Sequence, residues 1–377
     1  MSDVSLLSRV IPGLFQDLQA IQRNNLDPWR QSPGTVGRWT RRLRDAAWRT
    51  AGHAGLIRPG FSAADASARL QFLLGAQADL ERFYERLGDA RSRSLLVELL
   101  RLSVLGSRHV KLSVNDERYW RLREEAIRSR RATNVRTVGQ WSLDEYEMSA
   151  GWSGVRLHAQ AAHVLNTFLL EQYAYAHGRA PIRASAGQVV LDLGAGWGDT
   201  ALYFATLVGS AGRVYCLECT PDNLAVLDAN LQMNPTCAPV VEVVPRAAWH
   251  VSGQQLAFQF DGPASREAAA RSASTVTTIS VDDLVRERGL SRVDFIKMDI
   301  EGAEANALQG AQETIRRFKP TLAIAAYHRQ DDFVRLPRLI EQTGVPYDLY
   351  LDHFTIFDEE TVIFARSSPG ALQESVT

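Results

Sequence analysis

A short apolar run that leads directly into three glycines most constrains how this chain can fold. The stretch VVLDLGAGWGDTALYFA, residues 189–205, places apolar residues around Asp192, followed by Gly194, Gly196 and Gly198. Apolar runs of this length are typical of strands buried on both faces of a parallel sheet. Free N–H groups at the start of a following helix can bind carboxylate, hydroxyl or phosphate groups. The stretch therefore predicts a strand, a ligand-binding turn and a helix.

An alternation of strand and helix patterns continues from residue 188 towards the end of the chain. This order predicts an α/β fold with a doubly wound, mostly parallel sheet. Between residues 254 and 280, alternating apolar and polar residues predict an inserted hairpin. We expect strands over 188–193, 213–218, 240–244, 293–298, 320–326, 346–351 and 361–366, and helices over 199–208, 221–232, 281–288, 303–317 and 332–343.

The first part of the chain has a helical pattern instead. Residues 131–150 are interpreted as a connector, and a further helical pattern covers 157–178. We therefore expect a helical N-terminal domain over 1–150, serving acceptor recognition or oligomerisation, and an α/β domain over 151–377. Apolar residues recur at spacings of three and four over 6–21, 35–51, 63–88 and 91–107.

Charge and composition exclude several classes of protein. The chain of 377 residues is 45% hydrophobic and has a formal net charge of -1, which argues against bulk nucleic-acid binding. Residues 1–150 hold 24 Arg and Lys against 17 Asp and Glu, and the rest has the opposite excess. We interpret this basic half as a solvated or domain-facing surface, with an anionic partner as the alternative.

Cysteine usage and hydropathy predict a cytoplasmic protein without membrane association. Three cysteines are too few for a secreted disulfide scaffold, and Cys216-x-x-Cys219 lacks the second pair of a zinc site. The chain shows neither a charged leader before a sustained apolar segment nor a run of ~18 apolar residues. We expect no metal.

The identity of the expected ligand depends on Glu218, which ends the second strand. A carboxylate at this position can accept two hydrogen bonds from a ribose diol. The glycine spacing G-x-G-x-G differs from the G-x-G-x-x-G of dinucleotide folds, and no pyrophosphate-binding group is evident. These features favour S-adenosylmethionine over a nicotinamide cofactor, and a solvated strand-end acid is the alternative interpretation of Glu218.

Further polar and aromatic residues follow the next strands. Trp249 could cover an adenine or pack in the core. Asp299 and Glu301 follow the fourth strand and His328 follows the fifth. Carboxyl ends of parallel strands meet at one edge of a sheet, so we expect these residues to lie together there. The two acids could instead cap the following helix.

The segments LDLGAGWGDTALYFA, KMDIEGAE and the later YH followed by acids resemble the FkbM family of S-adenosylmethionine-dependent methyltransferases. The resemblance covers about residues 188–366 and implies a class I methyltransferase fold, Rossmann-like, with S-adenosylmethionine as cofactor. It places Asp299, Glu301 and His328 at the reacting end. The expected cofactor contacts are Asp192, Gly194, Gly196, Trp197, Gly198, Glu218, Asn223, Ala247, Trp249 and Asp299.

The same resemblance implies O-methylation of a small hydroxylated acceptor, such as a sugar or secondary metabolite. We predict that His328, assisted by Asp299 or Glu301, removes the hydroxyl proton. An alternative makes these three residues ligands of a divalent ion. Two rival functions are formation of a methyl ester on a carboxylate and a scaffold that binds the cofactor without catalysis.

Candidate acceptor contacts come from the segments around the α/β core. Chain order places Tyr146, His158, Glu171 and Tyr173 before the glycine turn, where they could cover the open side of the site. His353, beyond the sixth strand, is a further candidate. We expect a small-molecule acceptor, neither nucleic acid nor membrane as a partner, and a chain that is compatible with a homo-oligomer.

Overall fold

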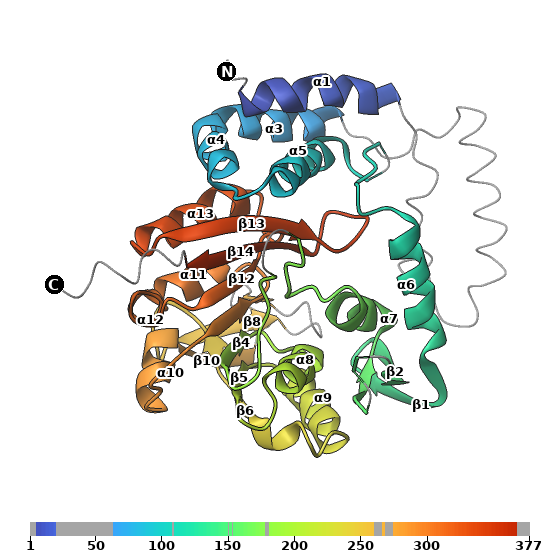
Figure 1. Ribbon diagram of the computed structural model, residues 1–377, viewed down its shortest axis with the longest axis vertical. Helices are drawn as coiled ribbons and strands as arrows, with labels where there is room; N and C mark the ends of the chain where they lie inside the picture. Colours follow the sequence, from blue (N-terminus) through green and yellow to red (C-terminus); the bar gives the residue numbers. More distant parts are fainter. Residues whose placement is uncertain are drawn as a thin grey trace. The chain divides into compact units, whose positions relative to one another are not determined.

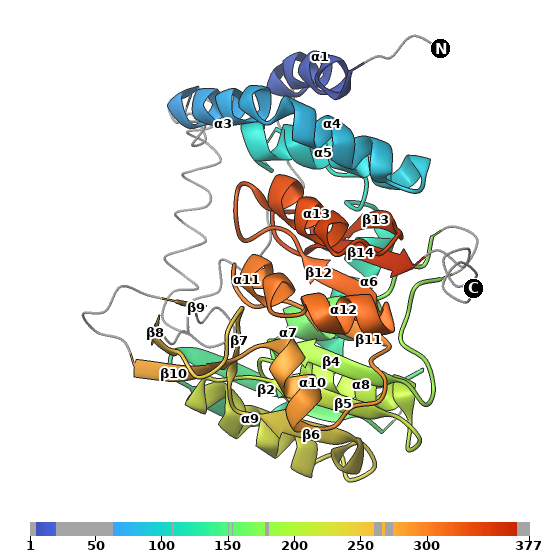
Figure 2. The same ribbon diagram turned by 90° about the vertical axis from the view of Figure 1, so that its left-hand side faces the viewer.

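The computed structural model describes residues 5–19, 63–107, 109–149, 151–152, 154–177, 181–259, 266–267 and 274–367. The helix expected over 35–51 lies outside these residues. The chain divides into two compact units (Figures 1 and 2). The main boundary lies between Asn115 and Asp116 and differs from the expected one at residue 150. The first unit comprises Met1–Tyr84, Ser94–Asn115 and Thr355–Asp358, and the second comprises Glu85–Arg93, Asp116–Phe354 and Glu359–Thr377.

The first unit is helical in its described part, as its sequence pattern predicts. It contains α1 (Leu6–Gln19), α3 (Ala63–Gly75) and most of α4 (Gln77–Arg86) and α5 (Ala90–Leu105). The Glu81 carboxylate accepts a hydrogen bond from the backbone N–H of Leu6 at 2.8 Å, which satisfies a free donor at the start of α1. Arg101 pairs with Asp17 near the other end of that helix. Polar contacts therefore fix both ends of α1.

The second unit is built on a seven-stranded sheet. Its strands lie in the order β6 (Val241–Val244), β5 (Arg213–Leu217), β4 (Val189–Leu193), β11 (Phe295–Met298), β12 (Thr321–Ala325), β14 (Thr361–Ser367) and β13 (Tyr347–His353). The first five are parallel, and β14 runs antiparallel to both of its neighbours. All seven expected strands are present, and the mostly parallel sheet is confirmed. The chain order reverses between β4 and β11, so a crevice is expected at their carboxyl ends.

Helices connect and cover these strands. Helix α8 (Asp199–Val208) lies on one face of the sheet, and α10 (Val281–Glu287) and α12 (Gln312–Phe318) lie on the other (Figure 1). Helices α9 (Pro221–Gln232) and α13 (Asp332–Gln342) also match the expected segments. The helix expected over 303–317 is divided into α11 (Glu304–Gln309) and α12. The division falls at Gly310, where a Cβ atom would lie 2.2 Å from the Trp249 carbonyl oxygen.

Strands within 130–147 and 156–159 form a small antiparallel sheet, so the interpretation of residues 131–150 as a connector is wrong. Strands β1 (Arg130–Val138) and β2 (Trp141–Glu147) pair on either side of Gly139, which has φ 55°. Strand β3 (Arg156–Ala159) pairs with β2, and helix α6 (Glu117–Arg128) precedes the sheet. β-Branched and aromatic residues on both sides of a glycine turn are the sequence signal that this interpretation overlooked.

The helical pattern over 157–178 is only partly confirmed. A short helix α7 (Ala161–His163) leads into the π-helix η1 (Val164–Leu169). The preceding residues pair as a strand because the side-chain oxygens of Asn230 and Asn234 accept hydrogen bonds from the N–H groups of His158 and Arg156. These long-range contacts from α9 override the local periodicity.

The hairpin expected between residues 254 and 280 is confirmed. Strands β8 (Gln255–Gln259) and β10 (Ser274–Ile279) pair antiparallel, β9 (Arg266–Glu267) pairs antiparallel with the other side of β8, and β7 (Ala247–Ala248) runs parallel to β10. A 3-10 turn η2 (Ala238–Val240) precedes β6. This four-stranded sheet follows β6 in the sequence. It brings Ala247 and Trp249 to the region beyond the end of β6.

A buried ion pair joins the two central strands of the large sheet. Lys297 of β11 and Asp192 of β4 are register partners, their Nζ and Oδ1 atoms lie 3.1 Å apart, and their side chains are 1% and 0% exposed. Lys297 also donates to the carbonyl oxygens of Leu193 and Gly194, and Thr200 donates its hydroxyl to Asp192 at 2.7 Å. Burial lowers the pKa of Lys297, but the carboxylates of Asp192, Asp299 and Asp199 together outweigh this effect and raise it.

Replacing Lys297 with Met should destabilise this unit by about 3–5 kcal/mol, because the Asp192 charge would stay buried without its cation. Urea unfolding followed by circular dichroism measures the change. The matched control is the double variant Lys297→Met with Asp192→Leu, which removes both charges and should recover most of the loss. A single variant as stable as the wild type would contradict this account of the pair.

Candidate functional site

The glycine turn follows β4 and requires its glycines at two positions. Gly194 has φ 83°, and a Cβ atom there would lie 1.9 Å from the Asp299 carbonyl oxygen. Gly198 has φ 87° and begins α8 as its left-handed N-cap. Between them, Gly196 donates its N–H to the Glu218 carboxylate at 3.0 Å. The turn therefore brings bare backbone against the ends of β5 and β11.

A cavity of about 550 Å³ lies at this edge of the sheet, entirely within the second unit. It is lined by residues from the glycine turn, the ends of β5, β11 and β12, and the π-helix η1, including Asn166 and Thr167. The sequence-predicted residues that line it are Tyr173, Gly194, Gly196, Trp197, Glu218, Asn223, Ala247, Trp249, Asp299 and Glu301.

Glu218 is fixed at one part of the cavity by several donors. Its Oε1 accepts the backbone N–H groups of Cys219 and Thr220 at 2.7 and 2.8 Å and also the Thr220 hydroxyl, and Oε2 accepts Gly196. Burial raises the pKa of Glu218, and the hydrogen bonds from Thr220 oppose the shift without cancelling it. Glu218 also lines the cavity, so a ribose hydroxyl could bind to its carboxylate.

An apolar wall stands near Glu218. Trp249 is 7% exposed and packs with Ala247, Leu256 and Val276, against which Cys219 also packs. The Trp249 indole N–H has no hydrogen-bond partner among the described residues. A flat aromatic base with an acceptor atom would match both the apolar surface and this donor.

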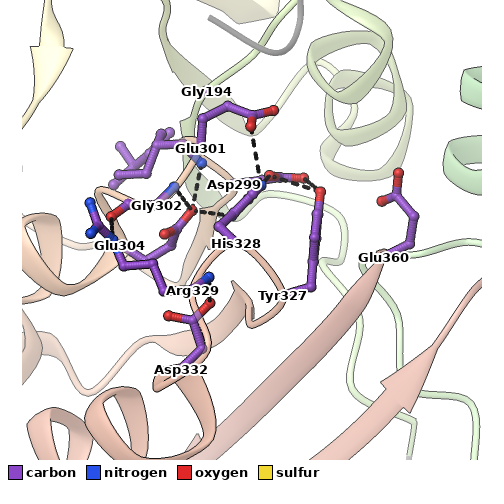
Figure 3. A network of polar contacts seen from close by, with 12 residues as sticks. Gly194, Asp299, Glu301, Gly302, Glu304, Tyr327, His328, Arg329, Asp332 and Glu360 are labelled. Carbon is purple, nitrogen blue, oxygen red and sulfur yellow. Dashed lines mark hydrogen bonds and ion pairs between the residues drawn. The ribbon is translucent and has the colours of Figure 1, made fainter. Parts of the chain in front are cut away.

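Asp299 lies at the carboxyl end of β11 and receives two tyrosine hydroxyls. Tyr173 donates to its Oδ2 at 2.8 Å. Tyr327 donates to its Oδ1 at 3.3 Å (Figure 3). Burial raises the pKa of both tyrosines, and the Asp299 charge adds to the shift, so both stay protonated donors. All three residues line the cavity.

The loop after Asp299 is held by Glu304, which is 1% exposed. Its Oε1 accepts the backbone N–H groups of Ile300 and Gly302, and the Arg329 side chain donates to the Gly302 carbonyl oxygen at 2.6 Å. This loop places Glu301 at φ 56°, a left-handed conformation that is uncommon for a residue with a side chain. Glu304 thus fixes the backbone that presents Asp299 and Glu301.

His328 lies among three carboxylates and does not line the cavity. Its Nδ1 is 2.9 Å from Glu304, and its Nε2 is 3.5 Å from both Asp299 and Glu301 (Figure 3). Burial lowers the pKa of His328, but the hydrogen bond to Glu304 and the three negative charges raise it to about 10. At neutral pH the imidazole is therefore protonated and has no lone pair free to accept a proton.

The same residues bear on the divalent-ion alternative. Asp299, Glu304 and His328 offer ligand atoms within 4.8 Å of one another, with Glu304 in place of the expected Glu301. Glu304 Oε1, the oxygen that faces His328, already accepts the backbone N–H groups of Ile300 and Gly302. This donor set fits a hydrogen-bonded network.

Two predicted cofactor residues lie behind the cavity wall. Asp192 is fully buried and pairs with Lys297, and Gly198 contacts Leu227 where a Cβ atom would be. Neither lines the cavity, in contrast to the expectation of direct cofactor contact. Asp192 acts through Lys297, which holds the carbonyl oxygen of Gly194.

Four of the five predicted acceptor residues also lie away from the cavity lining. Tyr146 is buried within β2, and His158 belongs to β3. Glu171 accepts the Tyr203 hydroxyl and pairs with Arg183, and His353 is hydrogen-bonded to Thr361. Acceptor contact by these four stays a prediction that the cavity lining does not support, because chain order alone does not show which face of a segment points inward. Only Tyr173 of this set lines the cavity.

Several cavity residues were not predicted from the sequence. Lys297 is one of only three lysines and interrupts the apolar strand FIKM, which is a signal that could have been used. Tyr327 precedes the predicted His328 directly. Glu360 and Gln172 line the cavity from loops, and no motif in the sequence marks them.

Comparisons with known proteins agree with this geometry. A sequence model described as the methyltransferase FkbM domain matches residues 180–356. This part of the chain matches the FkbM methyltransferase domain. The family resemblance and the class I methyltransferase fold are thereby confirmed, and S-adenosylmethionine is the cofactor of this domain.

One solved structure shows the same fold, and a second protein is reported for its similarity alone. The methyltransferase FkbM from Methylobacillus flagellatus KT is 20% identical, with a TM-score of 0.52 over 78% of this chain, and the chain spans 60% of that protein's length. Fibrillarin from Aeropyrum pernix, solved with natively bound S-adenosyl-L-methionine, is 14% identical, with a TM-score of 0.37 over 62% of this chain and 99% of its own. A search of curated proteins found no match.

Among the described residues, none of the helices is both long enough and apolar enough to cross a membrane.

Replacing Gly194 with Ala should weaken S-adenosylmethionine binding by at least about tenfold, because the new Cβ would force the turn away from Asp299. Calorimetric titration measures the dissociation constant. Gly253→Ala is the matched control, since Gly253 has φ 80° with open space around its Cβ position. Equal affinities in the two variants would contradict the assigned role of the close approach.

The raised pKa of His328 predicts how stability depends on pH. Its contribution is fully present below the unfolded pKa of about 6.5 and is lost as pH rises through the folded value of about 10. The free energy of unfolding of the wild type should therefore fall between these limits more steeply than that of His328→Gln. His250→Gln, at an exposed histidine, should keep the wild-type slope. Chemical unfolding at several pH values checks this, and parallel profiles for wild type and His328→Gln would refute it.

Proposed function

We propose that the protein transfers a methyl group from S-adenosylmethionine to a hydroxyl oxygen of a small-molecule acceptor. The observation that carries the proposal is Asp299, which lies on the cavity wall with two tyrosine hydroxyls on its oxygens. It lies beside the glycine turn, because its backbone N–H donates to Leu193 directly before Gly194. Cofactor and acceptor would therefore meet at the carboxyl ends of β4 and β11.

The residues present fit the cofactor. Glu218 and Gly196 would hold the ribose, and the wall of Trp249 and Ala247 would cover the adenine. The cofactor supplies a methyl group on a positively charged sulfur, which needs no further activation by the protein. The surrounding residues would align the acceptor and exclude water.

We assign changed roles to the three residues that the sequence places at the reacting end, Asp299, Glu301 and His328. The expected proton acceptor, His328, is protonated and lies behind the wall, so it would orient the carboxylates of Asp299 and Glu301. Asp299 and Glu301 would face the acceptor and the positive sulfur. The pair of acids favours a cationic partner electrostatically.

The charge of this wall favours hydroxyl over carboxylate acceptors. An acceptor carboxylate would meet the like charges of Asp299 and Glu301. The three Lys and Arg residues that line the cavity already have partners: Lys297 pairs with Asp192, Arg246 pairs with Glu287, and Arg329 donates to the Gly302 carbonyl oxygen. The rival formation of a methyl ester would therefore have to recruit one of these engaged cations for its substrate.

Titration of the protein with S-adenosylmethionine should release heat, and labelled methyl groups should pass to hydroxylated rather than carboxylated compounds. A panel of matched pairs, such as sugars and their uronic acids, separates the two acceptor classes. The labelled product should resist mild alkali, as an ether does and a methyl ester does not. Absence of heat, or a base-labile product, would overturn the proposal. Glu218→Ala controls for specific cofactor binding and should abolish the heat.

A further inference from the structure

Glu360 stands on the cavity wall in an uncommon backbone conformation. It directly precedes β14, has φ 66° and lines the cavity. Its carbonyl oxygen accepts the N–H of Phe354 at 3.1 Å, so the sheet fixes its backbone. A left-handed conformation costs a side-chain-bearing residue about 1 kcal/mol or more and clusters at functional sites. The backbone conformation therefore marks Glu360 as a candidate functional residue.

The Glu360 carboxyl group is anchored through one oxygen. Gln172 donates its side-chain amide to Oε2 at 2.5 Å. Gln172 is itself 3% exposed, and its backbone N–H donates to Asn166 of the π-helix η1 at 2.9 Å. No described residue donates a hydrogen bond to Oε1. One oxygen of Glu360 is thus held while the other is available to a ligand in the cavity.

The other carboxylates near the reacting end are more heavily engaged. Asp299 accepts two tyrosine hydroxyls and lies 3.5 Å from the His328 imidazolium, and Glu301 lies at the same distance from it. Glu304 accepts two backbone N–H groups and His328. Donors and positive charge stabilise a carboxylate and make it a weaker base. The Glu360 carboxylate accepts one hydrogen bond, from the uncharged Gln172 amide, and forms no ion pair with a described residue.

Glu360 and Asp299 line the same cavity. In Figure 3, its carboxyl group lies on the far side of Tyr327 from His328 and points the same way as the Tyr327 hydroxyl. Burial raises the pKa of Glu360, the charges of Asp299 and Glu301 raise it further, and Gln172 and His328 act in the opposite direction. A carboxyl group with a raised pKa is suited to accept a proton near neutral pH.

We propose that Glu360 is the catalytic base, with Gln172 as its positioning residue. This inference rests on the proposed function. The acceptor's hydroxyl proton moves to Oε1 of Glu360 as its oxygen bonds to the methyl carbon, while the electrons of the broken carbon–sulfur bond stay on sulfur. The proton then leaves Glu360 for solvent, and the acceptor becomes an uncharged methyl ether.

The test uses the full chain with a hydroxylated acceptor from the labelled-donor panel. Glu360→Gln keeps the size of the side chain and an oxygen for Gln172, yet cannot take up a proton. It should lower kcat about 10²- to 10⁴-fold. The dissociation constant for S-adenosylmethionine should change by less than about threefold. Asp358→Asn is the matched control, since it removes an exposed carboxylate two residues away and should leave kcat unchanged.

Two further readouts separate a base from a structural residue. The wild-type kcat should rise with pH through the pKa of Glu360, Glu360→Asp should keep this limb, and Glu360→Gln should lose it. Infrared difference spectra without acceptor, between about pH 5 and about pH 9, should contain a protonated-carboxyl band that Glu360→Gln removes.

The outcomes distinguish the two proposals. No heat from S-adenosylmethionine, or no methylated hydroxyl compound with the wild type, overturns the proposed function. A wild type that methylates its acceptor together with a Glu360→Gln variant of equal kcat and equal pH profile overturns only the role of Glu360. A variant that binds the cofactor, loses turnover and lacks both the pH limb and the infrared band supports it.

Discussion

The buried ion pair of Lys297 and Asp192 is the interaction on which the site depends. It joins β4 to β11 below the crevice, and its ammonium group also holds the carbonyl oxygens of Leu193 and Gly194. With that backbone fixed, Gly194 can pass the Asp299 carbonyl at a distance that excludes any side chain. This buried ion pair therefore fixes the position of the glycine turn relative to Asp299.

Charge at the reacting end is arranged in two layers. Asp299 and Glu301 line the cavity, whereas Glu304 and His328 lie behind them and tie the loop to its own backbone. The imidazolium offsets part of the negative charge that three neighbouring carboxylates would otherwise concentrate in a place of low dielectric. This arrangement explains how several acids can stay close together and still leave an electronegative surface for a positive sulfur.

The sequence predicts most of the fold, because each strand of the large sheet is a local apolar run bounded by turn residues. Gly194 and Glu218 could likewise be found, since parallel strands bring their ends to one edge. Glu360 and Gln172 could not, because their places depend on an antiparallel hairpin and on a π-helix, both set by tertiary contacts. His328 was found but misread, since its protonation depends on Glu304, which only the folded loop brings to 2.9 Å.

The π-helix η1 gives this site an unusual means of changing shape. Its backbone closes with the N–H of Leu170 bonded to the carbonyl oxygen of Leu165, five residues back, which is one residue more than an α-helical turn holds. Loss of a single residue there would restore α-helical winding and swing the following side chains by about 100° around the axis. A one-residue deletion there would therefore move Asn166 and Thr167, which line the cavity, while leaving the register of the large sheet unchanged.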